Sequence, residues 1–462
     1  MILVLLVALL GAVLYLGNKY LYSYWSKHGF TQYNPTFLVG DIMNLITQKE
    51  GMGEFCMNLY TATKKENKVL GIYLLTRPAL LINDPVLIRD IMIKDFQYFH
   101  DRGLYVDEEN DPLSGHIFSL PGLKWRKLRV KLTPTFTSGK LKSMFPTILE
   151  SGKVLETFIK KTLQSGNDIV EIRDLLARYN TDIIASIAFG IENDSVNDSN
   201  NIFREKGRKV FATTFKNSMR QTCSFIAPKI SLYFKVKSVD DDVEEFFLSM
   251  IKQTVDYREK NDVKRNDFMQ LLLQLKNNGY CAVDANDKES TDNGEEIDKT
   301  KLTLNELAAQ AFVFFLAGFE TTSTTMSYCL YELAKNIYIQ RAVQDEIDRH
   351  GEITYDSINA MKYLDCCVDE TLRKYPPVPV LNRECSKDYK IPNSNLIIPK
   401  GTPLLIPALA LHRDPNIYEN PLEFKPERFA TKPTGSDADG LFYMPFGDGP
   451  RICIGKKSIL ST

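Results

Sequence analysis

An apolar stretch opens the chain. Residues 1–17, MILVLLVALLGAVLYLG, carry no charged side chain, and Lys19 and aromatic residues at positions 20, 22, 24 and 25 follow directly. A helix of this length, at about 1.5 Å per residue, nearly spans a hydrocarbon layer of about 30 Å, and flanking aromatic rings and lysines favour the membrane–water interface. We therefore predict that residues 1–28 form an N-terminal membrane anchor.

A cleaved secretory signal is the alternative for this stretch. No basic residue precedes the apolar run, however, and no small-x-small cleavage motif follows it. Lys19 and Lys27 place positive charge after the run, and the positive-inside rule then keeps the following chain in the cytosol. An uncleaved anchor is therefore the prediction, with residues 29–462 on the cytosolic side.

The periodicity of apolar residues changes along the rest of the chain. From about residue 80 to 275 apolar residues recur at steps of three and four, as in LKSMFPTILESGKVLETFIKKTL at 141–163, which predicts amphipathic helices. Residues 276–300 are polar and acidic, which is typical of a solvated loop. After residue 375, prolines and short apolar runs such as LIIPKGTPLLIPAL predict short strands and turns. The pattern predicts a mainly α fold with a smaller β portion.

Composition and charge exclude several classes of protein. The 462 residues are 44% hydrophobic and 25% charged, as in an ordinary globular protein, and the formal net charge of -1 provides no overall attraction for a phosphate backbone. No nucleic-acid partner is expected. The eight cysteines form no C-x-x-C pair and show no disulfide-like spacing, which predicts a reducing compartment and disfavours structural zinc.

The stretch FGDGPRICIG at 446–455 places one cysteine, Cys453, in a glycine-rich, basic loop. Gly447, Gly449 and Gly455 permit backbone conformations that turn amide groups toward the sulfur, and Arg451 adds positive charge nearby. Such a loop favours a thiolate, the form of cysteine that binds metal ions. A small, buried structural cysteine is the alternative on this loop alone.

A long helix is predicted to begin at TLNE, residues 303–306. Thr303 and Glu306 have the spacing of a capping box, and mainly apolar residues follow. In the middle, AGFETT at 317–322 contains Glu320 and Thr321 among small residues that let a flat ligand approach. Hydroxyl groups there can bond helix carbonyls, so the helix is expected to open. A carboxylate and a hydroxyl in apolar surroundings are candidates for proton delivery, and a polar helix–helix contact is the alternative.

Two later segments carry charges that can meet. Glu370 and Arg373, in DETLRKYPPVP at 369–379, lie three residues apart on one helix face, and Pro376 is expected to end the helix. Arg428, in FKPERF at 424–429, provides a second guanidinium. A buried Glu370–Arg373–Arg428 network is therefore predicted, and an exposed pair of little energetic weight is the alternative.

Together these segments resemble the haem-thiolate monooxygenases, the cytochrome P450 family. FGDGPRICIG fits the haem-loop pattern F-x-x-G-x-R-x-C-x-G, AGFETT the oxygen-activating groove, ETLR the E-x-x-R pair and PERF its partner. The resemblance covers about residues 30–455 and implies the cytochrome P450 fold. The stretches WRKLRVKLTPTFTSGKLK at 125–142, FLAGFETTS and VLNRECSKDYKIP most resemble insect microsomal members of family six.

The resemblance implies a haem b cofactor, iron protoporphyrin IX, with Cys453 as the axial thiolate and metal ligand. It implies Glu320 and Thr321 as catalytic residues for oxygen activation. A haem-thiolate isomerase or dehydratase is a competing class, but such enzymes tend to lack this acid–threonine pair. The other residues implied to bind the cofactor are Phe446, Gly449, Arg451 and Gly455 of the loop, with Trp125, Arg129, Arg383 and Arg451 toward the haem propionates.

The resemblance also implies a reaction and partners. One oxygen atom of O2 would enter a lipophilic small molecule, with electrons from NADPH delivered by NADPH-cytochrome P450 reductase and with cytochrome b5 as a further partner. The expected location is the endoplasmic reticulum membrane, on its cytosolic face. Substrate is expected against the loop after Arg102, residues 314–321 and residues 378–382. The expected reductase-docking face consists of Lys124, Arg126, Lys127 and Lys131.

The end of the chain departs from the family pattern. KKSILST at 456–462 stands where family members begin an apolar helix that leads to a terminal hairpin. Residues 29–462 are therefore predicted to be a cytochrome P450 catalytic domain truncated after the haem-binding loop, with the C-terminal helix and hairpin missing. Each Å² of uncovered apolar surface would cost about 25 cal/mol, so poor haem retention is expected. An inactive, anchored pseudoenzyme is the alternative function.

Overall fold

The structure is a computed structural model that describes residues 1–166, 169–212, 214–280, 300–431 and 442–456. Most of the predicted polar loop at 276–300 and nearly all of the terminal KKSILST lie outside these residues. The chain divides into two compact units. The first comprises residues 1–103, 378–423 and 433–452, and the second comprises residues 104–377, 424–432 and 453–462.

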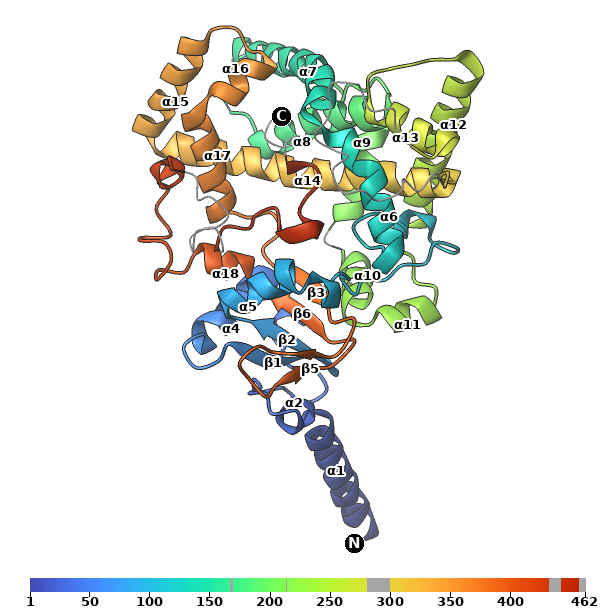
Figure 1. Cartoon of the computed structure of the whole chain (residues 1–462), viewed down its shortest axis with the longest axis vertical. Coiled ribbons are helices and arrows are strands. Elements are labelled where there is room, and N and C mark those ends of the chain that lie inside the picture. The colour runs from blue at the N-terminus through green and yellow to red at the C-terminus, as the bar shows by residue number, and fades with distance from the viewer. Residues whose placement is uncertain (167–168, 213, 281–299, 432–441, 457–462) are drawn as a thin grey trace. The chain divides into compact units, whose positions relative to one another are not determined.

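The described strands all belong to the first unit (Figure 1). A four-stranded sheet has the order β1-β2-β6-β3, in which β2 pairs parallel with β6 and the other neighbours are antiparallel. A two-stranded sheet joins β4 and β5. The strands are β1 (Val69–Leu74), β2 (Arg77–Ile82), β3 (Leu381–Glu384), β4 (Tyr389–Lys390), β5 (Ile397–Ile398) and β6 (Pro403–Ile406).

The predicted strands after residue 375 are confirmed, but the prediction of helix from about residue 80 is wrong at its start. Strand β2 extends to Ile82. Its neighbour β1 is buried at every position, so it lacks the alternation of polar and apolar residues that marks a half-exposed strand. Helices and turns complete this unit: α2 (Tyr24–Lys27), α3 (Met43–Ile46), α4 (Met52–Thr63), α5 (Pro85–Arg89), η1 (Asp90–Lys94), η2 (Phe96–Tyr98) and α18 (Ala408–His412).

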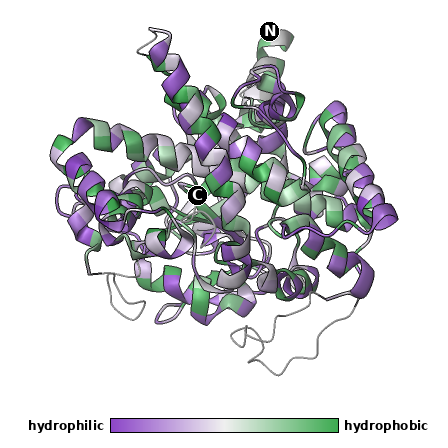
Figure 2. Ribbon diagram, turned by 90° about the horizontal axis from the view of Figure 1, so that it is seen from above, coloured by the Kyte–Doolittle hydropathy of each residue, from purple (hydrophilic) through white to green (hydrophobic). Residues whose placement is uncertain are grey.

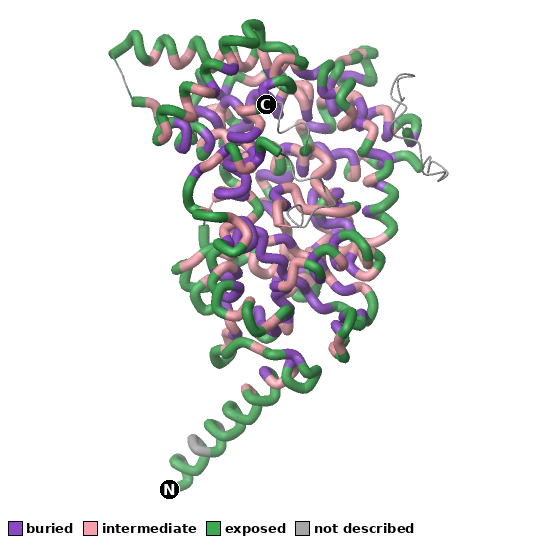
Figure 3. Tube along the Cα trace, turned by 60° about the vertical axis from the view of Figure 1, so that its left-hand side comes forward, coloured by how far each residue is buried: buried purple, intermediate pink, exposed green. Residues whose placement is uncertain are grey.

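The apolar N-terminus forms α1 (Ile2–Leu21), and nearly all of its described side chains are exposed (Figure 3). Its segment Val4–Leu21 has a mean hydropathy of 1.8 and none of it is buried, so it is long and apolar enough to cross a membrane. A signal sequence would share these properties. The exposed apolar surface supports the predicted anchor without deciding between the two.

The interfacial role predicted for Tyr22 and Trp25 is wrong. Both side chains are buried in the core of the first unit, and Trp25 donates its indole Nε1–H to the carbonyl oxygen of Ile72 at 3.0 Å. Gly71 makes room for the ring, because a Cβ there would lie 2.5 Å from the Trp25 Cγ. The aromatic cluster after α1 therefore holds the end of this helix to β1.

Asp41, whose carboxylate lies against β1 at Tyr73, provides a pH-dependent contribution to stability. Burial raises the pKa of its carboxyl to about 6, although the Tyr73 backbone N–H donates to it at 2.7 Å and acts in the opposite direction. A raised acid pKa means that the folded state holds the proton more tightly. The favourable contribution is therefore present at low pH and is lost as the pH rises from about 4 to about 6.

We expect Asp41→Asn to remove this dependence, because the amide cannot ionise. At pH 7 the variant should be as stable as the natural protein or more stable, by up to about 3 kcal/mol. Urea unfolding at several pH values measures the effect. A variant whose stability still falls between pH 4 and 6 as steeply as that of the natural chain would contradict this role of Asp41.

The second unit is helical, and the predicted mainly α fold is confirmed. Purple and green alternate along its helical ribbons, which is the expected amphipathic pattern (Figure 2). Buried phenylalanine rings pack its core, with Phe315 of the long helix 5.1 Å from both Phe203 and Phe247 between ring centroids. The helices are α6 (Gly122–Leu132), α7 (Ser138–Gln164), α8 (Ile172–Ile184), α9 (Ile202–Phe211), α10 (Phe215–Ile226), α11 (Pro228–Tyr233), α12 (Asp241–Asn261), α13 (Phe268–Asn278), α14 (Leu304–Lys335), α15 (Ile337–His350), α16 (Tyr355–Ala360) and α17 (Lys362–Lys374), with shorter turns η3 (Pro112–Ser114), η4 (Thr133–Phe136), η5 (Ala185–Phe189) and η7 (Pro426–Phe429).

The long helix α14 runs through the second unit, with α8 alongside its middle (Figure 1). Its predicted capping box is confirmed: the Glu306 N–H donates to Thr303 Oγ1 at 3.2 Å, and the Thr303 N–H donates to Glu306 Oε2 at 2.7 Å. The predicted opening at AGFETT is wrong, because α14 is continuous from Leu304 to Lys335. Bonds from hydroxyl groups to its carbonyls leave the backbone ladder intact there.

Candidate functional site

The cysteine loop is shaped by two glycines. Gly447 and Gly449 have φ of 72° and 69°, a region that favours glycine, and the turn η9 (Gly449–Arg451) follows an Asp448 side chain that accepts from the Gly449 N–H at 2.7 Å. A Cβ on Gly449 would lie 1.9 Å from the Met92 carbonyl oxygen. The predicted conformational role is confirmed for Gly447 and Gly449 and is wrong for Gly455, whose φ is not positive.

We expect Gly449→Ala to disorder this loop. A positive φ costs a residue with a side chain about 1–2 kcal/mol, and the clash with the Met92 backbone adds to that cost. Cofactor content per chain, measured by absorbance on the purified protein, should fall by about tenfold. Gly152→Ala on α7 is the matched control, because its Cβ would lie 4.0 Å from the Tyr179 hydroxyl, an ordinary contact far along the chain from the loop. Equal cofactor content in the two variants would contradict the assignment.

Cys453 differs from most other cysteines in the described chain. It is half-buried, whereas Cys56, Cys329, Cys367 and Cys385 are buried, and burial raises the pKa of each of those four thiols. For Cys385 the pKa is raised to about 12, so that thiol stays neutral. Buried neutral thiols are inert, whereas an accessible sulfur can act as a ligand.

Arg129 on α6 is the charged neighbour of Cys453. Burial lowers the pKa of the Arg129 guanidinium, and the charge of Cys453, which belongs to the same unit, acts in the opposite direction. In general, a neighbouring guanidinium favours the thiolate form of a cysteine. Spacing alone does not indicate this pairing, because the two residues lie far apart along the chain, although the family resemblance implied that both bind the cofactor.

A pair of buried guanidinium groups lies in the first unit. Arg383 on β3 is 1% exposed, its Nε finds no acceptor, and no carboxylate in the described chain lies within 4.0 Å of it. Burial and, to a smaller extent, the charge of Arg451 together lower the pKa of Arg383 to about 9, although the charge of Asp448 acts in the opposite direction. Arg451 donates its Nε to the His100 carbonyl oxygen at 2.6 Å, and its Nη2 lies 3.8 Å from Asp101 Oδ1.

Buried Arg383, whose Nε has no acceptor, fits an anionic ligand. A buried charge is costly unless it is paired, and Arg383 lacks a protein partner for its Nε. Carboxylates are well matched to guanidinium groups because the two planar groups share two hydrogen bonds. The arrangement therefore suits the propionates of a haem.

The middle of α14 exposes one face. Ala317 is exposed and Thr321 is half-buried, although most residues around them, such as Phe315, Phe319 and Thr322, are buried. Thr321 donates its Oγ1–H to the Ala317 carbonyl oxygen at 2.5 Å. The hydroxyl hydrogen is therefore engaged by the helix, and the oxygen lone pairs remain available on the exposed face as acceptors.

Glu320 is joined to α8. Its carboxylate Oε1 lies 3.3 Å from Arg173 Nη2, and the two side chains are 37% and 73% exposed. A pair this exposed contributes little to stability, since water screens it. The carboxylate is therefore open to solvent and only weakly held by Arg173.

An aromatic contact links the end of the cysteine loop to α14. The Phe136 ring is 5.1 Å from the Phe314 ring on α14, and Phe314 is 4.2 Å from Phe268, between centroids. Phe136 is also the nearest side chain to Gly455, two residues after Cys453. These residues all belong to the second unit, so the structure brings the Cys453 loop end close to the predicted groove helix.

The remaining predicted cofactor residues are distributed over the two units. Trp125 on α6 is 5% exposed and belongs to the same unit as Cys453 and Arg129, whereas half-buried Phe446 belongs to the unit of Arg383 and Arg451. Arg129 is a charged neighbour of Cys453 in the second unit, and Arg451 is a charged neighbour of Arg383 in the first.

The predicted buried network is confirmed. Glu370 and Arg373 on α17 are both fully buried, and two hydrogen bonds of 2.7 and 2.8 Å join the carboxylate to the guanidinium. The Lys425 N–H also donates to Glu370 Oε1 at 2.9 Å, and Arg428 Nε lies 3.4 Å from the same oxygen. Helix α17 ends at Lys374, close to the predicted Pro376. The network holds the 424–429 segment against α17.

The predicted basic face is wrong for Lys131. Its side chain is buried, and its ammonium donates to the Thr300 carbonyl oxygen. Lys124 is paired with Glu108, while Arg126 and Lys127 are exposed. Helical periodicity explains the difference: Lys131 follows Leu128 by three residues and therefore shares its buried face.

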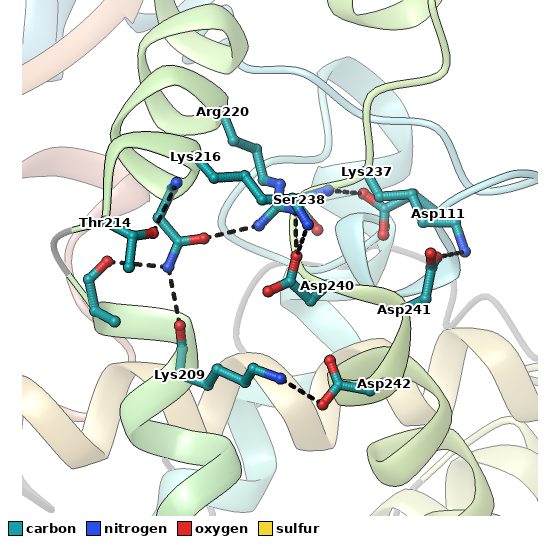
Figure 4. Close-up of polar contacts among 12 residues, drawn as sticks. Asp111, Lys209, Thr214, Lys216, Arg220, Lys237, Ser238, Asp240, Asp241 and Asp242 are labelled. Atoms are coloured by element: carbon teal, nitrogen blue, oxygen red, sulfur yellow. Dashed lines mark hydrogen bonds and ion pairs between the residues drawn. The ribbon is translucent and has the colours of Figure 1, made fainter.

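A small cavity lies elsewhere in the second unit, among α9, α10 and the start of α12. Ion pairs surround it: Lys209 lies 2.7 Å from Asp242, and Lys216 and Arg220 lie 2.5 and 2.8 Å from Asp240 (Figure 4). Each carboxylate already faces two cations, as Lys206 also bonds Asp242. These contacts tie the three helices together. None of the predicted site residues lines this cavity.

Comparison with known proteins covers nearly the whole chain. The profile of the family described as Cytochrome P450 matches residues 32–457. The chain is 42% identical over 453 residues to "Probable cytochrome P450 6d5" of Drosophila melanogaster, covering 96% of this chain and 88% of that protein. It is 41% identical over 446 residues to "Cytochrome P450 6A1" of Musca domestica, covering 94% of this chain and 84% of that protein. The predicted resemblance to insect members of family six is confirmed.

Proposed function

Because this chain belongs to the cytochrome P450 family and is therefore a monooxygenase, we propose that it inserts one oxygen atom of O2 into a lipophilic small molecule, with electrons from NADPH. NADPH-cytochrome P450 reductase would deliver the electrons, with cytochrome b5 as a further donor. Insect relatives at about 40% identity support the reaction class. Lipophilic plant toxins and insecticides are the substrates that we propose.

The observation that carries this proposal is Cys453, half-buried beside the Arg129 guanidinium at the end of a loop fixed by Gly449. We propose that it ligates the iron of haem b as a thiolate. Such a cofactor supplies the activation of O2, since a thiolate ligand favours cleavage of the O–O bond. Arg383, Arg451, Arg129 and Trp125 would bind the propionates, and the unpaired Nε of buried Arg383 supports this role. Phe446, Gly449 and Gly455 would shape the loop around the ligand sulfur.

Thr321 and Glu320 would deliver the protons that the reaction consumes. The Thr321 hydroxyl is held by the Ala317 carbonyl, which leaves its lone pairs to accept a hydrogen bond on the exposed face of α14. Glu320 is partly exposed and paired with Arg173. Its carboxylate could take a proton from water and pass it inward when the ion pair opens.

The same face of α14 would border the substrate. Phe314 and exposed Ala317 present carbon surface without charge, which suits a lipophilic molecule. The segments after Arg102 and at 378–382 are the other proposed contacts. We further propose that α1 anchors the protein in the endoplasmic reticulum membrane with the remaining chain on the cytosolic face, which would bring it close to substrates dissolved in the bilayer.

An oxygen-isotope experiment tests the proposal. The full chain, with its reductase in phospholipid vesicles, is given NADPH, a panel of lipophilic probes and O2 labelled with oxygen-18. Products should carry one labelled oxygen atom per molecule, whereas an isomerase product would carry none and a hydration product would take its oxygen from water. Haem-loaded protein that forms only unlabelled products, or that consumes no NADPH with any probe, would overturn the proposed function.

A further inference from the structure

Asn180 joins α8 to the middle of α14. Its Nδ2 donates to two consecutive carbonyl oxygens of α14, that of Gly318 at 2.5 Å and that of Phe319 at 2.9 Å. The side chain is only 2% exposed. An asparagine amide has two hydrogens on its nitrogen and none on its oxygen, so two carbonyl acceptors fix the orientation of the side chain.

Hydroxyl groups of α14 also donate hydrogen bonds to carbonyl oxygens in this part of the helix, including that of Phe319. Thr321 Oγ1 donates to Ala317, Ser323 Oγ to Phe319 at 2.7 Å and Thr325 Oγ1 to Thr321 at 2.8 Å. All three donors belong to α14 and move with it. Asn180 belongs to a different helix, so it ties these carbonyls to a reference point outside α14.

The two helices also touch at Gly318. A Cβ on Gly318 would lie 2.9 Å from the Cδ1 atom of Ile184, which follows Asn180 by one turn of α8. Glycine thus lets α8 approach closely enough for the short Asn180 side chain to reach the backbone. The close contact and the two hydrogen bonds act on the same turn of α14.

The position of this turn decides where the proposed proton-delivery groups point. Residues 317 and 321 lie one above the other on the exposed face, while Phe319 and Thr322 are buried. A side chain that bonds helix carbonyls draws them toward itself and bends the helix locally. Asn180 therefore acts on the backbone directly behind Glu320 and Thr321.

We propose that Asn180 is a positioning residue for oxygen activation, and this inference rests on the proposed function. It holds the Gly318 and Phe319 carbonyls against α8 and thereby fixes the place of the Thr321 hydroxyl and the Glu320 carboxylate. It acts through the α14 backbone, so it is not a catalytic residue in the strict sense.

The consequence is a change in the fate of oxygen. In the productive reaction, RH, O2, NADPH and one proton give ROH, H2O and NADP+. When proton delivery is misplaced, O2, NADPH and one proton give H2O2 and NADP+, so the O–O bond survives. Both reactions use two electrons of one NADPH. A defect in positioning therefore lowers product per NADPH while NADPH consumption continues.

The test compares Asn180→Ala with Asn193→Ala in the full chain with its reductase. Asn193 is a matched control, because its Nδ2 also donates two hydrogen bonds, to Asp182 Oδ1 on α8 at 2.6 Å and to Ser195 Oγ in the following loop at 2.7 Å, and neither acceptor belongs to α14. Product per NADPH should fall about fivefold or more in Asn180→Ala, with H2O2 rising to match, and stay near the natural value in Asn193→Ala. If Asn180→Ala forms as much product per NADPH as the natural protein, or if both variants lose the same amount, the proposal is overturned.

A second measurement does not depend on turnover. Amide hydrogen exchange in the peptide that covers residues 314–325 should be about tenfold faster in Asn180→Ala and unchanged in Asn193→Ala. If the natural chain makes no product, the proposed function fails, whereas equal exchange in the three proteins overturns the restraint by Asn180.

Should Asn180→Ala not fold, Asn180→Gln keeps both donors on a side chain one methylene longer. Product per NADPH in Asn180→Gln should lie between the values of the natural protein and Asn180→Ala. A natural value would contradict the need for a fixed position of the Glu320 and Thr321 side chains.

Discussion

Cys453→Ser is expected to abolish the thiolate-type absorption band that the reduced protein gives with carbon monoxide. A serine hydroxyl holds its proton far more tightly than a thiol does, so it cannot replace an anionic sulfur ligand. Arg129 lowers the cost of that anion in the natural chain. Product formation should fall to background, since the electron density that favours O–O cleavage comes from the thiolate.

Cys223→Ser is the control for this experiment. Cys223 is also only partly buried, so each substitution replaces one partly buried sulfur atom with oxygen. The control should keep the band and the turnover. A Cys453→Ser protein with an undiminished thiolate band would eliminate Cys453 as the ligand, and a disulfide mapped to Cys453 in the active protein would do the same.

Arg373→Met is expected to produce the largest loss of stability. The substitution leaves the Glu370 carboxylate fully buried without the two hydrogen bonds of 2.7 and 2.8 Å that now stabilise it. Breaking a buried pair in this way costs about 3–5 kcal/mol, a large part of the roughly 5–15 kcal/mol that stabilises a typical domain. Urea unfolding of the full chain in detergent should show the loss, and much of the protein is expected to aggregate.

The double variant Glu370→Leu with Arg373→Met separates the pair from the charge left behind. Removing both charges leaves no buried carboxylate without its partner, so this protein should be more stable than Arg373→Met alone. Glu156→Ala is the exposed control, because Glu156 Oε1 and Lys160 Nζ form an ion pair of 2.5 Å on the surface of α7. The unfolding midpoint of this variant should equal that of the natural protein. A double variant as unstable as the single one would indicate that packing, and not the buried charge, governs this site.

Several parts of the site could be predicted because their partners are close in sequence. The capping box of α14 and the positive φ of Gly447 and Gly449 involve residues within one turn, so spacing and residue type were sufficient. The pairing of Glu370 with Arg373 followed from one helical turn, although their complete burial came from the packing of α17 against the 424–429 segment.

Other features depend on contacts between distant segments. The sequence pattern around Trp25 resembled an interfacial aromatic cluster, but the space left by Gly71 buries the ring. Strand β1 has no alternation because both of its faces are covered. Lys131 is buried against Thr300, 169 residues away, which no run of basic residues could indicate.

By itself, the sequence determined the residues that can do the chemistry: a cysteine in a glycine-turned loop, an acid and a threonine on one long helix, and an apolar helix at the N-terminus. These depend on local backbone geometry and side-chain type, which neighbouring residues settle. Only the tertiary structure decided what surrounds them. The guanidinium near Cys453, the Arg383 Nε without an acceptor and the Asn180 amide behind Glu320 each come from segments far along the chain, and burial and electrostatics depend on how those segments pack.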